Sequence, residues 1–148
     1  MDSKSKVYFF FDNTSISLNN RTGLKKFIES IFKKEKKSLA GLNYVFCTDK
    51  RLLDINQQYL AHNYYTDIIT FDLSEDEKEI RGEIYISIDR VRSNAKTEGF
   101  PVSTELLRVI FHGVLHLCGY RDKEKEEKAL MREKEDYYIC KYLEQRST

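Results

Sequence analysis

The segment at residues 106–117 constrains the fold more than any other part of the chain. Apart from one arginine, two histidines and one glycine, every residue in it is leucine, isoleucine, valine or phenylalanine. Pro101, followed by Ser-Thr-Glu at 103–105, predicts the start of a helix, and Gly119 predicts its end. A helix that is apolar on nearly every face is buried. We therefore expect this helix at the centre of the fold, with the rest of the chain packed around it.

Apolar patterns before and after this segment predict short strands and further helices. Residues 22–37 carry apolar side chains at helical spacing. Residues 66–73 and 79–88 are rich in Ile, Phe, Tyr and Thr, and the charged connection at 74–78 predicts a hairpin between these two strands. The full set comprises strands at 7–11, 42–47, 66–73 and 79–88, and helices at 22–37, 48–60, 87–97, 103–117 and 122–143.

The resulting order of elements, β-α-β-α-β-β-α-α-α, predicts an α+β fold. We expect a small mixed β-sheet of about four strands with helices packed against it. The 148 residues contain no linker, repeat or low-complexity segment, so a single domain, 1–148, is expected. The last helix is highly charged, and its expected buried stripe consists of Ala129, Leu130, Tyr137 and Cys140.

The net charge excludes a basic field spread over the whole domain. Lys and Arg together number 25 and Asp and Glu number 24, which gives a net charge of +1. A chain with this balance needs a local basic patch to bind nucleic acid. The most basic run lies at 33–37. It fits a solvated last helical turn, or alternatively a surface that faces phosphates.

The cysteines and the apolar runs indicate the compartment. Cys47, Cys118 and Cys140 are far apart and form no C-x-x-C pair, which is typical of a reducing environment. The apolar run at 7–11 is too short for a secretory signal. No stretch reaches the ~20 apolar residues of a membrane span. These features predict a soluble cytoplasmic protein that does not contact a membrane.

Two of the three histidines lie four residues apart in the apolar helix. Residues at this spacing share one helix face, so His112 and His116 can reach one metal ion at ~2.0–2.1 Å. Gly119 breaks the helix, and Asp122 can then supply a third ligand. The alternatives are that the histidines are hydrogen-bonded core residues, that Gly119 is a plain helix C-cap, and that Asp122 caps the next helix.

The offsets of these residues match those of a known hydrolytic motif. Positions 112, 116, 119 and 122 have the spacing of the metzincin zinc proteases, H-E-x-x-H-x-x-G-x-x-H. The glutamate that acts as general base in that motif is replaced here by Gly113. The spacing therefore predicts a hydrolytic metal site, whereas the residues do not support protease chemistry.

The segment His-Gly-Val-Leu-His-Leu-Cys-Gly-Tyr at 112–120 closely resembles the signature of the YbeY family of bacterial rRNA maturation factors, H-G-x-L-H-L-x-G-Y-D-H. Upstream, 56–59 resembles the family's N-x-x-Y, 66–71 its T-D-V-L-S-F and 82–87 its G-D-I-x-I-S. The resemblance covers about residues 44–136, close to two thirds of the chain.

The resemblance implies a metal-dependent, single-strand-specific endoribonuclease. Such an enzyme acts in rRNA maturation, at the 3′ end of the small-subunit 16S rRNA, and in ribosome quality control. The implied partners are ribosomal RNA and the small subunit, and the implied cofactor is Zn²⁺, one per chain. His112 and His116 are the implied ligands. The oligomeric state is not indicated by the sequence.

The chain departs from the family pattern at four positions. The third histidine falls on Asp122, which is still a legitimate zinc ligand, and the aspartate before it falls on Arg121. The arginine that often follows N-x-x-Y in the family is Leu60 here, and the aspartate of G-D is Glu83.

A phosphodiester substrate calls for a cation beside the metal and for polar groups along the cleft. Arg121, next to the expected third ligand, is the candidate catalytic cation. Thr66, Asp67 and Thr70 are the candidate substrate-binding residues, with strand-end capping and hairpin contacts as their alternative role. Tyr64 and Tyr65 could stack on bases or pack in the loop.

Two other functions stay open at this point. One is a metal hydrolase with a non-RNA substrate, which the metzincin spacing favours and Gly113 opposes. The other is a ribosome-assembly factor with structural zinc and little catalysis, favoured by Leu60 and the near-neutral charge.

Overall fold

The computed structural model describes residues 4–62 and 65–147. Its elements follow in the order β1 (Val7–Phe11), α1 (Arg21–Lys34), β2 (Leu39–Cys47), α2 (Asp49–Leu60), β3 (Ile68–Asp72), β4 (Ile80–Ser87), α3 (Ile88–Glu98), α4 (Val102–Leu117) and α5 (Lys125–Ser147). This order and the mixed four-stranded sheet confirm the predicted α+β class.

The sheet has the strand order β1-β2-β4-β3. β1 and β4 both run parallel to β2, whereas β3 pairs with β4 in the antiparallel direction, as the predicted hairpin requires. β2 starts earlier than predicted because Leu39 pairs with Ile80 across a register shift. β3 is an edge strand, and its first predicted residues, 66 and 67, precede the ladder.

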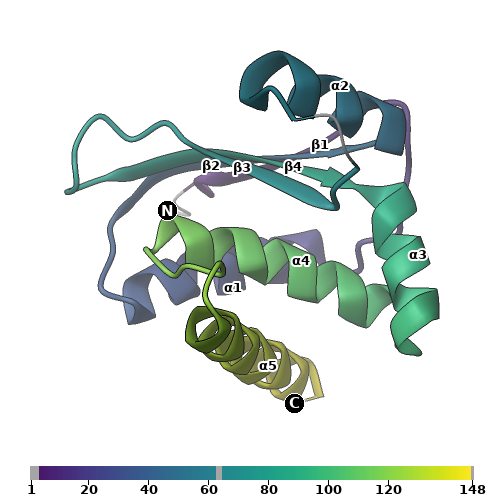
Figure 1. The fold of residues 1–148 in the computed structure, drawn as a ribbon. Helices are drawn as coiled ribbons and strands as arrows, with labels where there is room; N and C mark the ends of the chain where they lie inside the picture. Colours follow the sequence, from purple (N-terminus) through teal and green to yellow (C-terminus); the bar gives the residue numbers. More distant parts are fainter. Residues whose placement is uncertain (1–3, 63–64, 148) are drawn as a thin grey trace.

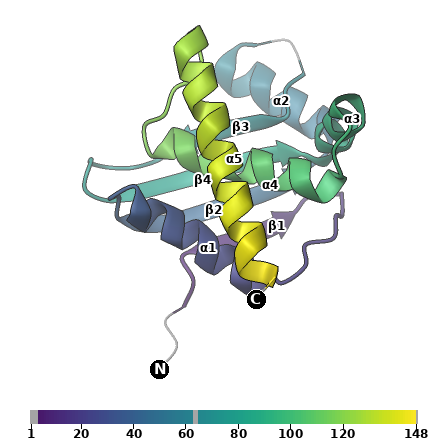
Figure 2. The same cartoon turned by 90° about the horizontal axis from the view of Figure 1, so that it is seen from below.

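The helices form layers around this sheet (Figure 1). α2 covers one face, and α1 and α4 cover the other. α5 lies outside α4 and crosses it on the side away from the sheet (Figure 2). α4 is therefore enclosed between the sheet and α5, which is the central position that its apolar sequence predicts.

Two contacts fix α4 against the sheet. The Tyr44 hydroxyl, fully buried, donates a hydrogen bond to the carbonyl oxygen of Ile110 at 2.9 Å. Gly113 lies so close to β4 that a Cβ atom there would approach Cδ1 of Ile84 to 2.6 Å. Position 113 thus faces the sheet, and glycine permits the close approach of the helix.

The prediction of which face of the last helix is buried is wrong. Leu130 and Cys140 are exposed, and the apolar residues that α5 buries are Met131, Tyr138, Ile139 and Tyr142. These positions recur at helical spacing and bury more apolar surface than the expected stripe, so they set the rotation of the helix. α5 also begins at Lys125, three residues after the predicted start.

The cysteines are all free thiols, with Cys47 and Cys118 buried and Cys140 exposed. Among residues 4–62 and 65–147, no helix combines the length and the apolar character needed to cross a bilayer.

Candidate metal centre

The site is built on one face of the last turns of α4. His112 and His116 lie one turn apart, with ring centroids 4.7 Å apart and planes inclined by 79°. The helix ends at Leu117, and the chain turns at Gly119, whose φ of 106° glycine alone adopts without strain. The Tyr120 hydroxyl then donates to Oε1 of Glu35 at 2.7 Å. This turn and this anchor direct the following loop back toward the histidines.

Asp122 completes a group of three ligand atoms. Its Oδ2 lies 3.2 Å from Nε2 of His112 and 3.3 Å from Nε2 of His116. Two ligands bound tetrahedrally to zinc at ~2.0–2.1 Å would be about 3.3 Å apart. All three ligand atoms lie within 4.8 Å of one another. The donor set and its spacing therefore fit a zinc-sized ion.

Asp122 does not cap the following helix. α5 begins at Lys125, and its first turn is capped instead by Glu127, whose Oε1 accepts hydrogen bonds from the backbone N–H groups of Lys123 and Glu124. Because Glu127 performs the capping, the Asp122 carboxylate is available to face the histidines.

A second carboxylate orients His112 from the opposite side. The Nδ1–H of His112 donates to Oε2 of Glu135 at 2.6 Å, which leaves Nε2 directed toward Asp122. The other oxygen of Glu135 accepts from Nη1 of Arg108 at 3.2 Å, and Nη2 of Arg108 lies 2.8 Å from Oδ1 of Asp136. A carboxylate hydrogen-bonded to a ligating histidine fixes its tautomer and raises its basicity.

Electrostatics at His112 favour a cation. Burial lowers the pKa of His112, but the carboxylates of Glu135, Asp122 and Asp67 outweigh burial, and its pKa is raised overall. The same negative charges attract a metal ion. Because the ligating nitrogen must be unprotonated, metal and proton compete for it.

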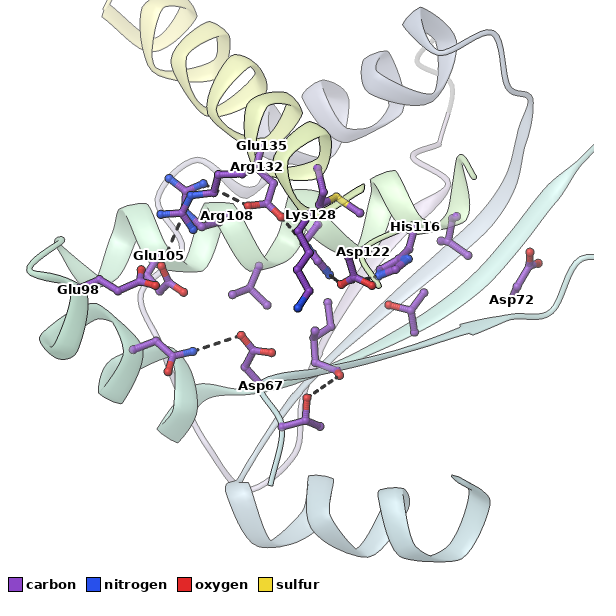
Figure 3. A pocket seen from close by; sticks show the side chains of 18 residues that line it. Asp67, Asp72, Glu98, Glu105, Arg108, His116, Asp122, Lys128, Arg132 and Glu135 are labelled. Atoms are coloured by element: carbon purple, nitrogen blue, oxygen red, sulfur yellow. Dashed lines mark hydrogen bonds and ion pairs between the residues drawn. The ribbon is translucent and has the colours of Figure 1, made fainter. Parts of the chain in front are cut away.

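The three ligand residues lie in a cleft of about 670 Å³ (Figure 3). Residues 66–72 form one wall, α3 contributes Asn94 and Glu98, and α4 and α5 form the other walls. The cleft joins the edge of the sheet to the proposed ligands. It is therefore the place where a substrate would meet the metal.

The structure brings all three predicted substrate-binding residues to this cleft, where Thr66, Asp67 and Thr70 line the wall opposite α4. The Thr66 hydroxyl also donates to the carbonyl oxygen of Ile68 at 3.3 Å, which is the strand-end role considered as its alternative. Oδ2 of Asp67 accepts from Nδ2 of Asn94 at 3.2 Å, and burial raises the pKa of Asp67.

The predicted catalytic cation lies elsewhere. Arg121 is exposed and is not among the cleft-lining side chains, because the loop turns Asp122, its neighbour, toward the histidines. Its catalytic role stays a prediction. Leu60, where the family often has arginine, ends α2 on the other face of the sheet (Figure 1). Tyr64 lies outside the described residues. Tyr65 is exposed, and the guanidinium of Arg90 lies over its ring, 4.8 Å from the centroid.

Several site residues escaped the sequence analysis. Glu135, Arg108, Lys128 and Arg132 all line the cleft. The sequence could have identified Arg108, because it is the one charged residue inside an otherwise apolar helix segment. The others lie in a helix full of charges, where nothing local separates a buried glutamate from an exposed one.

Replacing Glu135 with glutamine is expected to weaken metal binding about 10–100-fold. The amide can still accept from Nδ1 of His112, but it lacks the negative charge that supports the ligand and pairs with Arg108. Competition with a chromophoric chelator measures the affinity. The matched control is Asp136→Asn, which removes a carboxylate that contacts Arg108 without touching His112. Equal affinities for Glu135→Gln and the wild type would contradict the prediction.

The comparisons with known proteins agree with this geometry. A model of the family described as endoribonuclease YbeY matches residues 10–143. A Cytophaga hutchinsonii protein named Endoribonuclease YbeY is 50% identical over 130 residues, which are 88% of this chain and 91% of that protein. A Flavobacterium psychrophilum protein of the same name is 50% identical over 119 residues, covering 80% of this chain and 84% of that protein.

A solved structure gives the same result for the fold. The solution structure of a Thermotoga maritima protein is similar with a TM-score of 0.63 and 28% identity, covering 95% of this chain and 92% of that chain. The family match, the two relatives and this structure extend over most of the chain, so the similarity is not confined to a single motif.

Proposed function

This chain belongs to the endoribonuclease YbeY family, and from this membership we propose that it is a metal-dependent endoribonuclease that cleaves single-stranded RNA. The observation that carries the metal dependence is the group of three ligand atoms from His112, His116 and Asp122 in the cleft. Three protein ligands with a fourth position open to solvent are typical of catalytic rather than structural zinc.

We propose zinc as the metal, with a single ion per chain. Two imidazole nitrogens and one carboxylate oxygen form a donor set that zinc accepts readily. The carboxylate oxygen moves the preference slightly toward harder ions such as manganese. The side chains of His116 and Asp122 are 32% and 36% exposed, so solvent or a substrate can reach the ligands.

When bound, the metal would activate a water molecule or polarise a phosphoryl oxygen of the RNA. The residues of the chain hold and orient the site. Glu135 keeps the proton of His112 on Nδ1, so that Nε2 is free to ligate. Across the cleft, Asp67 and Asn94 present a hydrogen-bonded polar pair to an entering substrate.

The substrate that we propose is ribosomal RNA, at the 3′ end of the small-subunit 16S rRNA, with the small subunit as partner and the cytoplasm as location. Support comes from the signature at 112–120 and from the three upstream motifs that resemble the family. A role in ribosome quality control follows from the same resemblance.

The packing of Gly113 disfavours the peptidase alternative. Position 113 faces Ile84 of the sheet, so it offers no side chain to the cleft and no room for the glutamate base of the metzincins. The assembly-factor alternative rests on Leu60, which leaves the C-terminal end of α2 without the family's arginine. It differs from the proposal in predicting RNA binding without turnover.

Removal of the metal tests the proposal. The wild-type protein is expected to cleave a labelled single-stranded RNA that carries the 3′ end of small-subunit rRNA. A chelator should abolish cleavage, and added zinc or manganese should restore it, because the chemistry would depend on an ion held by His112, His116 and Asp122. Gel analysis measures the products, and a double-stranded RNA and casein serve as controls. Metal-independent RNA binding without products would favour the assembly factor.

A further inference from the structure

The cleft contains more negative than positive side chains. Its carboxylates are Asp67, Asp72, Glu98, Glu105, Asp122 and Glu135. Its cations are Arg108, Lys128 and Arg132. An RNA strand carries a negative charge on every phosphate, so it cannot settle here unless cations offset the carboxylates.

Arg108 is not available for this purpose. Its guanidinium contacts Glu135 at 3.2 Å and Asp136 at 2.8 Å, and its side chain is only 10% exposed. The charge of Arg108 is therefore neutralised within the protein. Lys128 and Arg132 are the cleft-lining cations that remain.

Lys128 and Arg132 differ from Lys134, Lys141 and Arg146 of the same helix. In the described part of the chain, neither side chain forms an ion pair, a side-chain hydrogen bond or a ring contact, and both are exposed. By contrast, Lys134 lies over the ring of Tyr120, Lys141 pairs with Glu144, and Arg146 lies over the ring of Tyr142. Lys128 and Arg132 are therefore the two α5 cations that line the cleft, and their charges are available to a ligand.

Their spacing suits a linear polyanion. Residues four apart lie on one face of a helix, about 6 Å apart along its axis. This separation is of the same order as that of neighbouring phosphates along an extended strand. The buried side chains of Met131 and Glu135, on the same side of α5, hold this face against α4. Lys128 extends from α5 into the cleft (Figure 3).

We infer that Lys128 and Arg132 bind the phosphates of single-stranded RNA next to the cleaved bond, and so provide cationic contacts in the cleft, which Arg121 does not line. The inference rests on the proposed function, which it deepens by assigning the substrate backbone to α5. Both residues are positioning residues, because they hold neighbouring phosphates and not the reacting one.

The experiment compares two double variants of equal charge. Lys128→Gln with Arg132→Gln removes the proposed contacts. Lys50→Gln with Lys125→Gln removes two exposed lysines that do not line the cleft. Anisotropy of a fluorescein-labelled oligouridylate is measured on metal-free protein between ~50 and ~200 mM salt. With metal, KM and kcat are measured on the same RNA.

The cleft variant is expected to bind the oligouridylate about 10-fold more weakly at low salt, and its slope of log affinity against log salt should be smaller by about 1.4, since each single-strand phosphate contact contributes ~0.7. KM should rise with little change in kcat, and the control variant should keep the wild-type slope. Equal slopes and equal KM values for the two variants would overturn the inference. Loss of binding to an acidic peptide, with RNA binding unchanged, would overturn it in favour of a protein ligand.

Failure of the proposed nuclease function would be seen in a different measurement from failure of this inference. A wild-type protein that binds the oligouridylate but does not cleave RNA with any added metal would overturn the nuclease proposal. The salt slopes require no turnover, so they decide the role of Lys128 and Arg132 in either case.

Discussion

Replacing His116 with alanine is expected to reduce bound metal from a stoichiometric amount to a trace, and RNA cleavage by more than about 100-fold. Loss of a residue that only hydrogen-bonds to a metal ligand lowers metal affinity ~10–100-fold, and loss of the ligand itself lowers it more. Two protein ligands would remain, His112 and Asp122, which hold zinc poorly. Mass spectrometry of the purified protein gives the metal content, and the RNA assay gives the activity.

His62→Ala is the matched control, because His62 is exposed and lies outside the cleft. It should retain metal and activity. The His116 side chain is 32% exposed and lines the open cleft, so alanine should change thermal unfolding in chelator only slightly. Asp122→Ala should also lose metal, as expected for a ligand and not for a helix cap. Full metal content in His116→Ala would remove this histidine from the ligand set.

Replacing Arg108 with methionine is expected to lower the free energy of unfolding by about 3–5 kcal/mol. The arginine lies among the carboxylates of Glu105, Glu135 and Asp136, and the first two side chains are 4% and 6% exposed. Methionine fills much of the same volume but removes the cation beside the buried carboxylates of Glu105 and Glu135, and Glu135 keeps only its hydrogen bond to His112. Urea denaturation at about pH 7 measures the change.

The loss of stability in Arg108→Met should depend on pH. In the wild type, burial raises the pKa of Glu105 to about 7, Glu98 adds to the rise, and Arg108 opposes it. A carboxyl group with a raised pKa holds its proton more tightly in the folded chain than in the unfolded chain. The folded state therefore loses stability as the pH rises from the unfolded to the folded pKa. Removing Arg108 raises that pKa further, so the part of the deficit that comes from Glu105 should grow as the pH rises above about 7 and shrink as the pH falls back to about 7.

Arg121→Met provides the control for this substitution. Arg121 is exposed and outside the cleft, so its replacement should change the free energy of unfolding by less than about 0.5 kcal/mol. Equal stabilities of the Arg108 and Arg121 variants would mean that the buried carboxylates are neutral at all pH values tested. The same control shows whether Arg121 contributes to RNA cleavage.

The sequence predicted those parts of the fold that have a strong local signal. The apolar run at 106–117 has no amphipathic alternative, and it forms the buried core helix α4. The strand order β1-β2-β4-β3 could not be predicted, because it depends on pairings between segments far apart in the chain. The rotation of α5 was predicted wrongly, since Leu130 and Met131 are both apolar neighbours and only the packing on α4 selects Met131.

A similar distinction applies to the site. His112, His116 and Asp122 lie within eleven residues, so helix geometry and a turn were enough to predict that they meet. Glu135 is 23 residues from His112, and their contact depends on how α5 crosses α4. The spacing of residues along the sequence does not predict how two helices cross. The position of Arg121, turned away from the cleft, likewise follows from the loop conformation and not from its place in the sequence.

The position of Asp122 has a consequence for the amount of protein in a cell. Both histidines belong to the core helix, whereas Asp122 belongs to the loop that leads to α5, so a bound ion ties that loop to the core. A ligand that binds only the folded chain stabilises it by about 2.7 kcal/mol at a free concentration of about 100 Kd. Since proteases remove unfolded chains, scarcity of the metal would lower the abundance of the protein as well as its activity. The steady-state level of this chain would then report the metal supply of the cell.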